Sequence, residues 1–309
     1  MTTTRMVGLA VAGICLGLLT ASPVFADGLA DFEKMIKPQI PAGALTYKSS
    51  KALGDDGFVL EGVVITPPPD AGKSDKPQPI NVKAITVETL DFESIEKQQP
   101  PLYAKIKFDG ITTGSSAGGF DLKQMAGVDS LSADFGINYE LDPDDKTFTL
   151  KRLELNLNGL GKLETSFVVD GVSADAATQP DKAMENASLK SASLTYDDHS
   201  LLTKVIPVVA AMQGSDPKAM IAMATAFLDQ ARTGQGKDAQ KAIDLLVAYM
   251  EDYQKPKGPI KILLDPPDKV SNAELSDAKT ADDMVKLLGI KVFYAGTRAS
   301  TPADAPAKK

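Results

Sequence analysis

The sequence predicts an α+β fold, in which a long, curved antiparallel β-meander carries a C-terminal helical block packed on it. Apolar and polar residues alternate from Leu131 to Leu141, and this period of two is typical of a strand with one buried and one solvated face. Short turns then lead into two further apolar segments, 148–157 and 163–172, as in a meander. After Asp197 the apolar spacing becomes helical, which predicts amphipathic helices that cover the sheet.

The N-terminal 26 residues have the features of a secretory signal peptide. Arg5 precedes an apolar run from Val7 to Leu19, and Val24-Phe25-Ala26 offers small residues for a signal peptidase. The run is shorter than the roughly 20 residues that a membrane span needs. Lipidation at Cys15 is disfavoured, because Ile14 occupies a position that requires a small residue. We expect cleavage after Ala26, export to a periplasm, and no stable membrane span in the mature chain.

Composition excludes several classes of protein. Without residues 1–26 the chain has 41 acidic and 32 basic side chains, so nucleic acid is not an expected partner. Cys15 is the only cysteine, so the mature chain is no disulfide scaffold and must be stabilised by buried area and backbone pairing. With one histidine and no mature cysteine, we expect no transition-metal site.

Before the central meander, an apolar pattern at 29–36 that ends at Pro38 predicts a short helix packed on the sheet. The proline-rich segment 67–79 cannot complete a strand ladder and is expected to lie outside the sheet. Residues 120–125 are expected to form one helical turn. The strands predicted in this part of the chain are 44–49, 57–66, 80–95 and 102–108.

Two predicted strands change their apolar phase by one residue. In 80–95 the apolar positions move from one face to the other, and in 148–157 the pair Lys151-Arg152 separates two phases. Such a slip indicates a β-bulge, which bends and twists its strand. Two bulges in long strands therefore favour a curved sheet.

After a polar loop at 173–186 and a strand at 187–196, three helices are predicted. The first begins near Leu201 and contains Pro207, which implies a kink or an early end. Asp216-Pro217 is an N-cap followed by proline at the first helical position. The expected buried stripe of this second helix is Met220, Ile221, Ala224, Phe227, Leu228 and Ala231, and that of the third is Ile243, Leu246, Val247, Met250 and Tyr253.

The C-terminal part predicts further short elements. Residues 260–264 are strand-like, and Ser271–Glu274 and Thr280–Asp283 both have the spacing of a capping box. Gly289 suits the end of a helix and precedes a last strand at 290–294. The resulting organisation is a signal peptide (1–26), a β-sheet region (27–196), a helical region with returning strands (197–296) and a disordered tail (297–309).

One cluster contains catalytic residue types, Asp197-Asp198-His199-Ser200. Consecutive side chains leave the backbone in different directions and cannot converge on one substrate atom, so a Ser-His-Asp site would need its serine or its acid from elsewhere in the chain. The favoured interpretation is that Asp198 or Ser200 caps the helix beginning near Leu201. We expect no enzyme and assign no catalytic residue.

Binding motifs are similarly sparse. Asp142, Asp144 and Asp145 are suitable for a weak calcium site, but they lack the EF-hand glycine and distal glutamate, and a hairpin turn is favoured. No cofactor or metal site is assigned. Methionines in the helical region are interpreted as core residues, with a lipid-facing surface as the alternative: Met212, Met220, Met223 and Met250.

The segments Phe148-Thr-Leu-Lys-Arg-Leu-Glu-Leu-Asn-Leu-Asn-Gly-Leu-Gly and Ser193-Leu-Thr-Tyr-Asp-Asp-His-Ser-Leu resemble exported bacterial sheet-repeat proteins of the AsmA-like and YdgA-like kind. The resemblance covers about residues 130–205. It implies a place in the cell envelope and, through the AsmA-like members, lipid handling. The present chain is short and has no retained membrane anchor, and we transfer no functional residue to it.

The leading hypothesis is a non-catalytic periplasmic protein that binds an apolar ligand, a lipid or another envelope component. The alternative is a structural or protein-interaction module of the envelope with a filled core and no ligand cavity. Phe135 and Ile137 are predicted to lie on the buried face of a central strand, and Asp134 on its solvated face. A continuous apolar cavity favours the first hypothesis, and a filled core favours the second. If the sheet face lines an open lipid groove, Phe135→Ala costs much less stability than in a core and weakens ligand retention.

Overall fold

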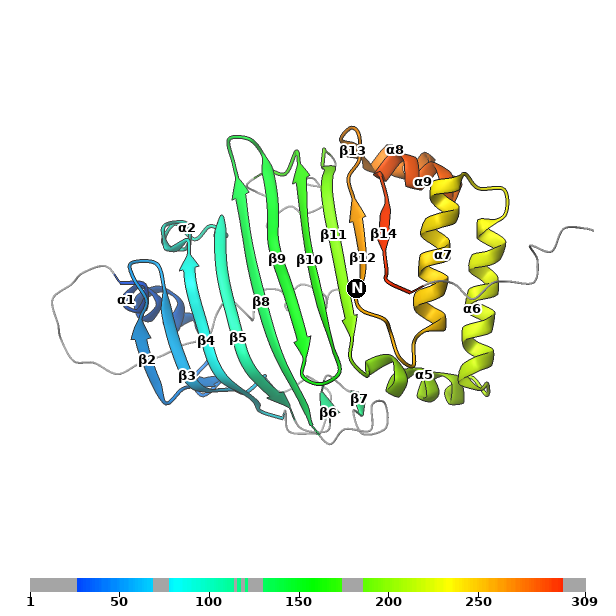
Figure 1. The fold of residues 1–309 in the computed structure, drawn as a ribbon. Helices are drawn as coiled ribbons and strands as arrows, with labels where there is room; N and C mark the ends of the chain where they lie inside the picture. Colours follow the sequence, from blue (N-terminus) through cyan, green and yellow to red (C-terminus); the bar gives the residue numbers. More distant parts are fainter. Residues whose placement is uncertain are drawn as a thin grey trace, which may run out of the picture. The chain divides into compact units, whose positions relative to one another are not determined.

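The computed structural model describes residues 27–68, 78–113, 116–117, 120–121, 130–173 and 186–296 (Figure 1). The predicted signal peptide (1–26), most of the loop 67–79, most of 173–186 and the tail 297–309 lie outside these residues. The chain forms two compact units that divide between Asn158 and Gly159. We call them unit 1 and unit 2 and describe each separately.

Unit 1 is a curved antiparallel sheet with helices near its N-terminus. Its described elements are α1 (Gly28–Asp31), η1 (Phe32–Ile36), η2 (Lys37–Gln39), β1 (Leu45–Thr46), β2 (Ser49–Ala52), β3 (Phe58–Ile65), β4 (Ile80–Leu90), α2 (Phe92–Glu96), β5 (Tyr103–Thr113), β6 (Ser116–Ala117), β7 (Phe120–Asp121), β8 (Leu131–Asp142) and β9 (Thr147–Leu157).

The strands of unit 1 follow one another in the order β1-β3-β4-β5-β8-β9, with β2 paired to β3. Each described pair in this order is antiparallel, so the predicted meander is confirmed. A separate small pair is formed by β6 and β7. The turn predicted as helical at 120–125 is therefore wrong at Phe120–Asp121, which is strand, and its remaining residues lie outside the described part of the chain.

Both predicted bulges are present. The register of β4 against β5 shifts between Val87 and Thr89. In the β8–β9 pair, Asn138 opposes Arg152 and Tyr139 opposes Leu150, so Lys151 is the extra residue. A further shift occurs between β5 and β8, near Gly110, whose φ of +61° favours glycine.

The strand predicted at 80–95 ends earlier, at Leu90, and this part of the prediction is wrong. Asp91 terminates it by acting as the N-cap of α2: its carboxylate accepts hydrogen bonds from the N–H groups of Ser94 (3.0 Å) and Leu102 (2.9 Å). The apolar residues that resembled a continuing strand, Phe92 and Ile95, instead pack on the core from one helical turn.

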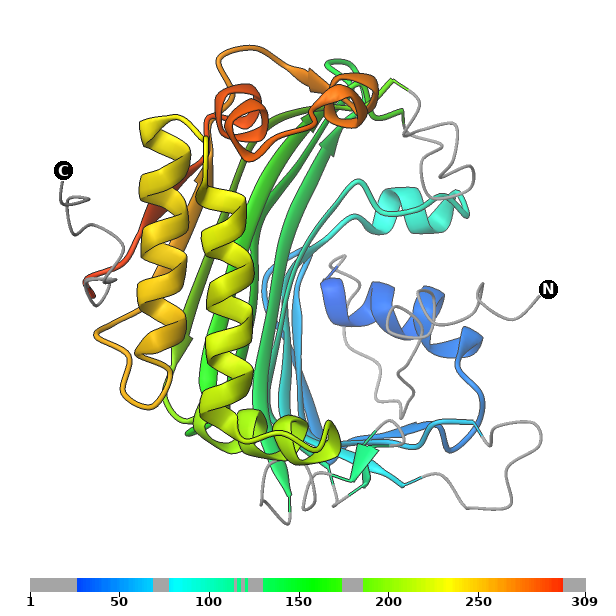
Figure 2. The ribbon, with the colours of Figure 1, turned by 90° about the vertical axis from the view of Figure 1, so that its right-hand side faces the viewer.

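The core of unit 1 lies between β3–β5 and the helical segment α1–η2 (Figure 2). Phe32 and Ile36 are buried against the strands, as the helical pattern at 29–36 predicts. The Phe32 and Phe58 rings lie 4.3 Å apart. The fully buried residues of this cluster include Phe32, Leu60 and Val63.

Unit 2 combines a smaller sheet with most of the helices. Its described elements are β10 (Gly161–Asp170), β11 (Ser188–Asp198), α5 (Leu201–Met212), α6 (Pro217–Arg232), α7 (Lys237–Glu251), β12 (Ile260–Leu264), β13 (Val270–Ser271), α8 (Asn272–Asp277), α9 (Ala281–Leu288) and β14 (Lys291–Phe293).

The sheet of unit 2 has the order β10-β11-β12-β14, with β13 paired to β11, and all of these pairs are antiparallel. Helix α7 packs on this sheet through Ala242 and Tyr249, which form a cluster with Ile260 and Val292. The ring of Tyr249 makes edge-to-face contacts with Tyr196 and Tyr294. The predicted helical block packed on a sheet is thus confirmed within unit 2.

Local helix signals agree with the structure. Asp216 caps α6 with Pro217 at its first position, and α8 and α9 both begin with a complete capping box. Gly289 ends α9 in the left-handed conformation. Pro207 does not end its helix, because α5 continues to Met212. No helix in the described residues is long and apolar enough to span a membrane.

Candidate functional site

The main candidate site is an apolar sheet face in unit 1. Residues that oppose one another in antiparallel strands share a face, and three rows of apolar residues cross β3, β4, β5, β8 and β9 in this way. The rows are Phe58–Val87–Ile106–Ile137–Leu153, Leu60–Ile85–Phe108–Phe135–Leu155 and Val63–Val82–Ile111–Ala133–Leu157.

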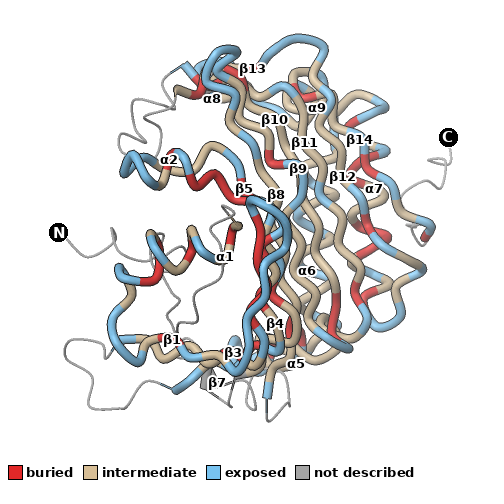
Figure 3. The backbone as a smooth tube through the Cα atoms, turned by 90° about the vertical axis from the view of Figure 1, so that its left-hand side faces the viewer, coloured by how far each residue is buried: buried red, intermediate tan, exposed pale blue. Residues whose placement is uncertain are grey.

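Burial decreases along these rows, with the exception of Ala133 on β8, which is buried. In the second row Leu60 is 0%, Ile85 8% and Phe108 9% exposed, whereas Phe135 and Leu155 are only half-buried. The buried residues of the sheet are concentrated on β3 and β4, and most residues along β8 and β9 are intermediate (Figure 3). In these rows the apolar side is therefore most deeply buried at β3 and β4 and only partly buried at β8 and β9, where Ala133 is still buried. We call the half-buried residues Phe135, Ile137, Leu153, Leu155 and Leu157 the β8–β9 face.

The cause of this difference is the position of the helices. The main helix contacts of unit 1 are those of α1 with β2 and β3 and of α2 with η1. In the part of unit 1 that the structure describes, no helix packs comparably on β8 or β9. The expectation that Phe135 and Ile137 are buried is thus wrong in degree: their facing is as predicted, but both are half-buried.

The opposite side of β8 and β9 is polar, which confirms the predicted facing. Asp134 accepts hydrogen bonds from the Gly110 N–H (2.8 Å) and from the Asn156 amide (3.2 Å), and Lys151 pairs with Glu140. The apolar side has one polar group, the hydroxyl of Tyr139, which donates to the Pro101 carbonyl at 3.2 Å. Burial raises the pKa of Tyr139 to about 12, with the charge of Asp91 adding to the effect.

A second apolar surface lies on α6 in unit 2. Met223 is 65% and Phe227 71% exposed, and they follow Ala219, Ala222 and Ala226 around one side of the helix. We call these five residues the α6 surface. The predicted buried stripe is wrong for Phe227. Its other members, Met220, Ile221, Ala224, Leu228 and Ala231, are partly buried, and no residue of this helix is fully buried. Met212, at the end of α5, is 81% exposed, so the core interpretation is also wrong for Met212 and Met223.

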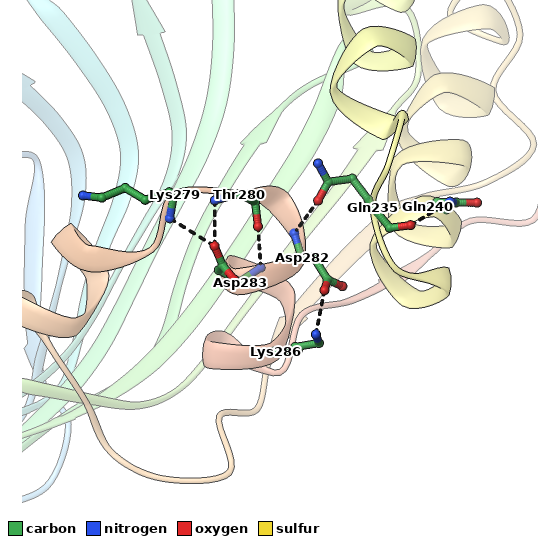
Figure 4. A network of polar contacts seen from close by, with 7 residues as sticks. All are labelled: Gln235, Gln240, Lys279, Thr280, Asp282, Asp283 and Lys286. Carbon is green, nitrogen blue, oxygen red and sulfur yellow. Dashed lines mark hydrogen bonds and ion pairs between the residues drawn. The ribbon is translucent and has the colours of Figure 1, made fainter.

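Despite this exposure, helix α6 is held in place by a capping hydrogen bond and an ion pair. The Asp216 carboxylate accepts the Ala219 N–H at 2.9 Å, and Arg232 forms an ion pair with Asp244 of α7 at 2.8 Å. The loop after α6 is also held, because the side-chain oxygen of Gln235 accepts the Asp282 N–H at 2.9 Å (Figure 4). The α6 surface is therefore the open side of a fixed helix.

A pocket of about 430 Å³ lies where α5, α6 and α7 meet. Its apolar lining is supplied by Pro207, Pro217 and Tyr253, and its polar lining by Thr203, Asp216, Lys218 and Gln254. The Thr203 hydroxyl already donates to the Ser200 carbonyl at 2.7 Å. The Asp216 carboxylate likewise accepts the Ala219 N–H, and the Gln254 amide donates to the Tyr253 hydroxyl at 3.2 Å, so several polar groups of the pocket are already engaged within unit 2.

The Asp197–Ser200 cluster does not assemble a catalytic site. His199 lies 3.5 Å from Asp197, both being exposed, while the Ser200 hydroxyl donates to the Gly159 carbonyl at 2.7 Å. The buried Asp198 accepts the Leu202 N–H at 3.0 Å and the Tyr196 hydroxyl at 2.8 Å. Of the two predicted caps, Asp198 satisfies the first turn of α5 with its side chain, and Ser200 does not.

Two buried polar atoms beside this cluster have no hydrogen-bond partner among the described residues: Asp198 Oδ2 and the Tyr249 hydroxyl. Burial raises the pKa of Tyr249, and the Asp198 charge raises it further. The same causes, with the Asp198 hydrogen bond, raise the pKa of Tyr196. Both phenols stay protonated at neutral pH, and the Tyr196 hydroxyl donates a hydrogen bond to Asp198.

The turn at Asp142 is a hairpin turn, as favoured. Its carboxylate accepts the N–H groups of Asp144 (2.9 Å) and Asp145 (3.0 Å), which occupies an oxygen that a calcium ion would need. Among the residues that the structure describes, no group of three or more acidic, histidine or cysteine side chains is arranged to hold a metal ion.

Comparison with known proteins gives one family. Residues 154–294 match the model of a family described as an uncharacterized protein. The match includes the end of β9 and the elements of unit 2 through β14. No curated protein matches the chain.

Proposed function

We propose that this chain is a non-catalytic periplasmic protein that binds an apolar ligand, a lipid or another apolar component of the envelope, on the β8–β9 face. The observation that carries the proposal is the decrease in burial from β3 and β4 to β8 and β9 along the rows through Leu60 and Phe58 of unit 1. The rows remain apolar after their cover ends, at Phe135, Ile137 and Leu155. A contiguous, partly exposed apolar surface of this kind is typical of a binding site.

The chemistry of the β8–β9 face suits a hydrocarbon chain. Its side chains are aliphatic or aromatic, and its polar neighbour Tyr139 is already hydrogen-bonded. Each methylene that such a face removes from water contributes about 0.8 kcal/mol. A ligand with a long acyl chain is therefore favoured over a compact polar one.

The sequence supports the parts of the proposal that concern export and location in the envelope. The signal-like segment ending at Ala26 and the absence of cysteine after Cys15 support a periplasmic protein. The resemblance of residues 130–205 to AsmA-like and YdgA-like proteins supports an envelope component as the ligand.

The test is native mass spectrometry and lipid extraction of the gently purified protein, followed by titration with a fluorescent fatty acid. Ile137→Glu places a charge on the β8–β9 face, and we expect it to abolish binding because a carboxylate cannot be desolvated against hydrocarbon. Asn138→Glu, on the opposite face of the same strand, is the matched control and retains binding. Protein that is lipid-free and does not bind the added fatty acid contradicts the proposal.

The second candidate function is a structural or protein-interaction module of the envelope. The observation that favours it is the α6 surface, where Met223 and Phe227 are exposed on a fixed helix. A pull-down from envelope extract tests it. If this function is correct, Phe227→Glu releases a stoichiometric partner and Ile137→Glu does not.

A further inference from the structure

The α6 surface carries an inference that is independent of the ligand proposal. Between Lys218 and Asp229, α6 contains ten consecutive uncharged residues. A helix that is apolar on all sides is normally enclosed by other elements. Here only one side is covered: α6 packs mainly on α7 and, at its N-terminal end, on α5, and it lies at the edge of unit 2 in Figure 1.

The open side has the spacing of a helix–helix seam. Ala219, Met223, Ala226 and Gln230 follow one another at intervals of four, three and four residues, which places them in one line along the helix. Phe227 lies beside this line. Small and large residues alternate along the line, and such alternation permits a second helix to approach closely.

Charged residues at the two ends of this line of residues indicate which kind of helix can pack against α6. Lys218 and Asp229 are eleven positions apart, which is close to three full turns and places them on the same flank. Lys218 is exposed and forms no ion pair among the residues described here. In an antiparallel pair of α6 helices related by a two-fold axis, Lys218 of each chain faces Asp229 of the other. The seam is thus complementary to itself in charge.

A bilayer fits this surface less well. Helices that lie in a membrane surface have many basic residues on the polar side. The charged residues of α6 are Lys218, Asp229 and Arg232, and Arg232 is already paired with Asp244. The chain as a whole has a net charge of −8, which opposes approach to anionic lipid.

We propose that the α6 surface is a dimerisation surface, on which α6 of a second copy of this chain packs in antiparallel orientation. The contact involves little more than one helix from each chain. Interfaces of less than about 1,200 Å² are characteristic of weak association, so the dimer forms at high protein concentration.

The test is sedimentation velocity of the full exported protein at concentrations between about 1 and 300 µM, the range in which small interfaces associate. We expect the wild type to change from monomer to dimer, and Phe227→Glu to raise the dissociation constant by about ten-fold or more. Phe293→Glu, which changes another exposed phenylalanine of unit 2, is the matched control and leaves dimerisation unchanged. Circular dichroism verifies that each variant is folded.

A charge exchange identifies the orientation. Lys218→Glu weakens the dimer, because it brings two carboxylates together, and Lys218→Glu with Asp229→Lys restores it. A wild type that is monomeric throughout overturns the proposal, as does a dimer insensitive to Phe227→Glu or to the exchange. Monomeric protein that sediments with phosphatidylglycerol vesicles through Phe227 also overturns it, in favour of a membrane surface.

Discussion

The two halves of the unit 1 sheet have the same apolar side but different environments. At β3–β5 the rows are covered by α1–η2, and Leu60 is completely buried. At β8–β9 the same rows continue through Phe135 and Leu155, which are half-buried. An apolar strand face therefore indicates only where a core can form. Whether the face becomes core or binding surface depends on which other segment of the chain packs on it.

The largest expected effect is in the covered half. Leu60→Ala removes a side chain with no exposed area, and the cavity that remains adds to the lost burial. Changes of this type cost about 2–5 kcal/mol, so we expect a large decrease in the denaturant midpoint of unit 1. A loss below about 1 kcal/mol contradicts the assignment of β3–β5 as the core.

In the open half, Phe135→Ala is expected to cost less. A fully buried phenylalanine contributes about 3–5 kcal/mol, and Phe135 is half-buried beside Phe108, with ring centroids 5.9 Å apart. We expect a loss of about 1–2 kcal/mol together with weaker retention of a bound fatty acid. If the loss equals that of Leu60→Ala, β8–β9 is covered in solution and the comparison fails.

Asp134→Ala, the neighbouring change, has a smaller but measurable effect. The sequence alone treats Asp134 as a surface residue whose removal matters little, within about 0.5 kcal/mol. Its carboxylate, however, accepts the Gly110 N–H at the β5 bulge, so truncation leaves this donor without its partner at a cost of about 1 kcal/mol. Glu140→Ala, at an exposed position of the same strand, is the control. Equal midpoints for the two variants show that the bulge does not depend on Asp134.

Local features of the fold were predictable from the sequence. The alternation in β8, the extra residue at Lys151 and the capping boxes of α8 and α9 depend on residues close together in the chain. The early end of β4 was missed because Phe92 and Ile95 satisfy a strand pattern and a helical turn equally well. The Asp91 cap, followed by Ser94, was the available signal for the turn.

The candidate surfaces were less predictable from the sequence. Whether an apolar surface is covered depends on contacts between segments that are distant in the chain. Phe108 and Phe135 oppose each other in neighbouring strands and have similar patterns, yet Phe108 is a member of the buried cluster and Phe135 packs against it only partly buried. In α6 the apolar residues assigned to a buried stripe include Phe227, which is exposed. The signal was the uncharged run from Ala219 to Leu228, since apolar residues around the whole helix exceed what one neighbouring helix can bury.

The smallest expected effect is a pH dependence of local stability that is restricted to the covered half of the sheet, at Asp91. Burial alone would raise the pKa of Asp91, but hydrogen bonds from Ser94 and from the Leu102 N–H dominate and lower it. Because the folded pKa lies below the unfolded value, Asp91 stabilises the protein above about pH 4. This contribution is lost as the pH falls through the folded pKa.

The measurement is amide hydrogen exchange of the wild type and Asp91→Asn between about pH 6 and pH 3, corrected for the intrinsic pH dependence of exchange. We expect the wild type to protect α2 and α1–η2 more than Asp91→Asn does near pH 6, and the difference to shrink as Asp91 is protonated. Amides of β8 and β9, whose apolar face has no carboxylate among the described residues, serve as the internal reference and change little between the two proteins. If Asp91→Asn reduces the protection of β8–β9 amides as much as that of α2 amides, the two halves of the sheet unfold together. Their different burial then has no effect on local stability.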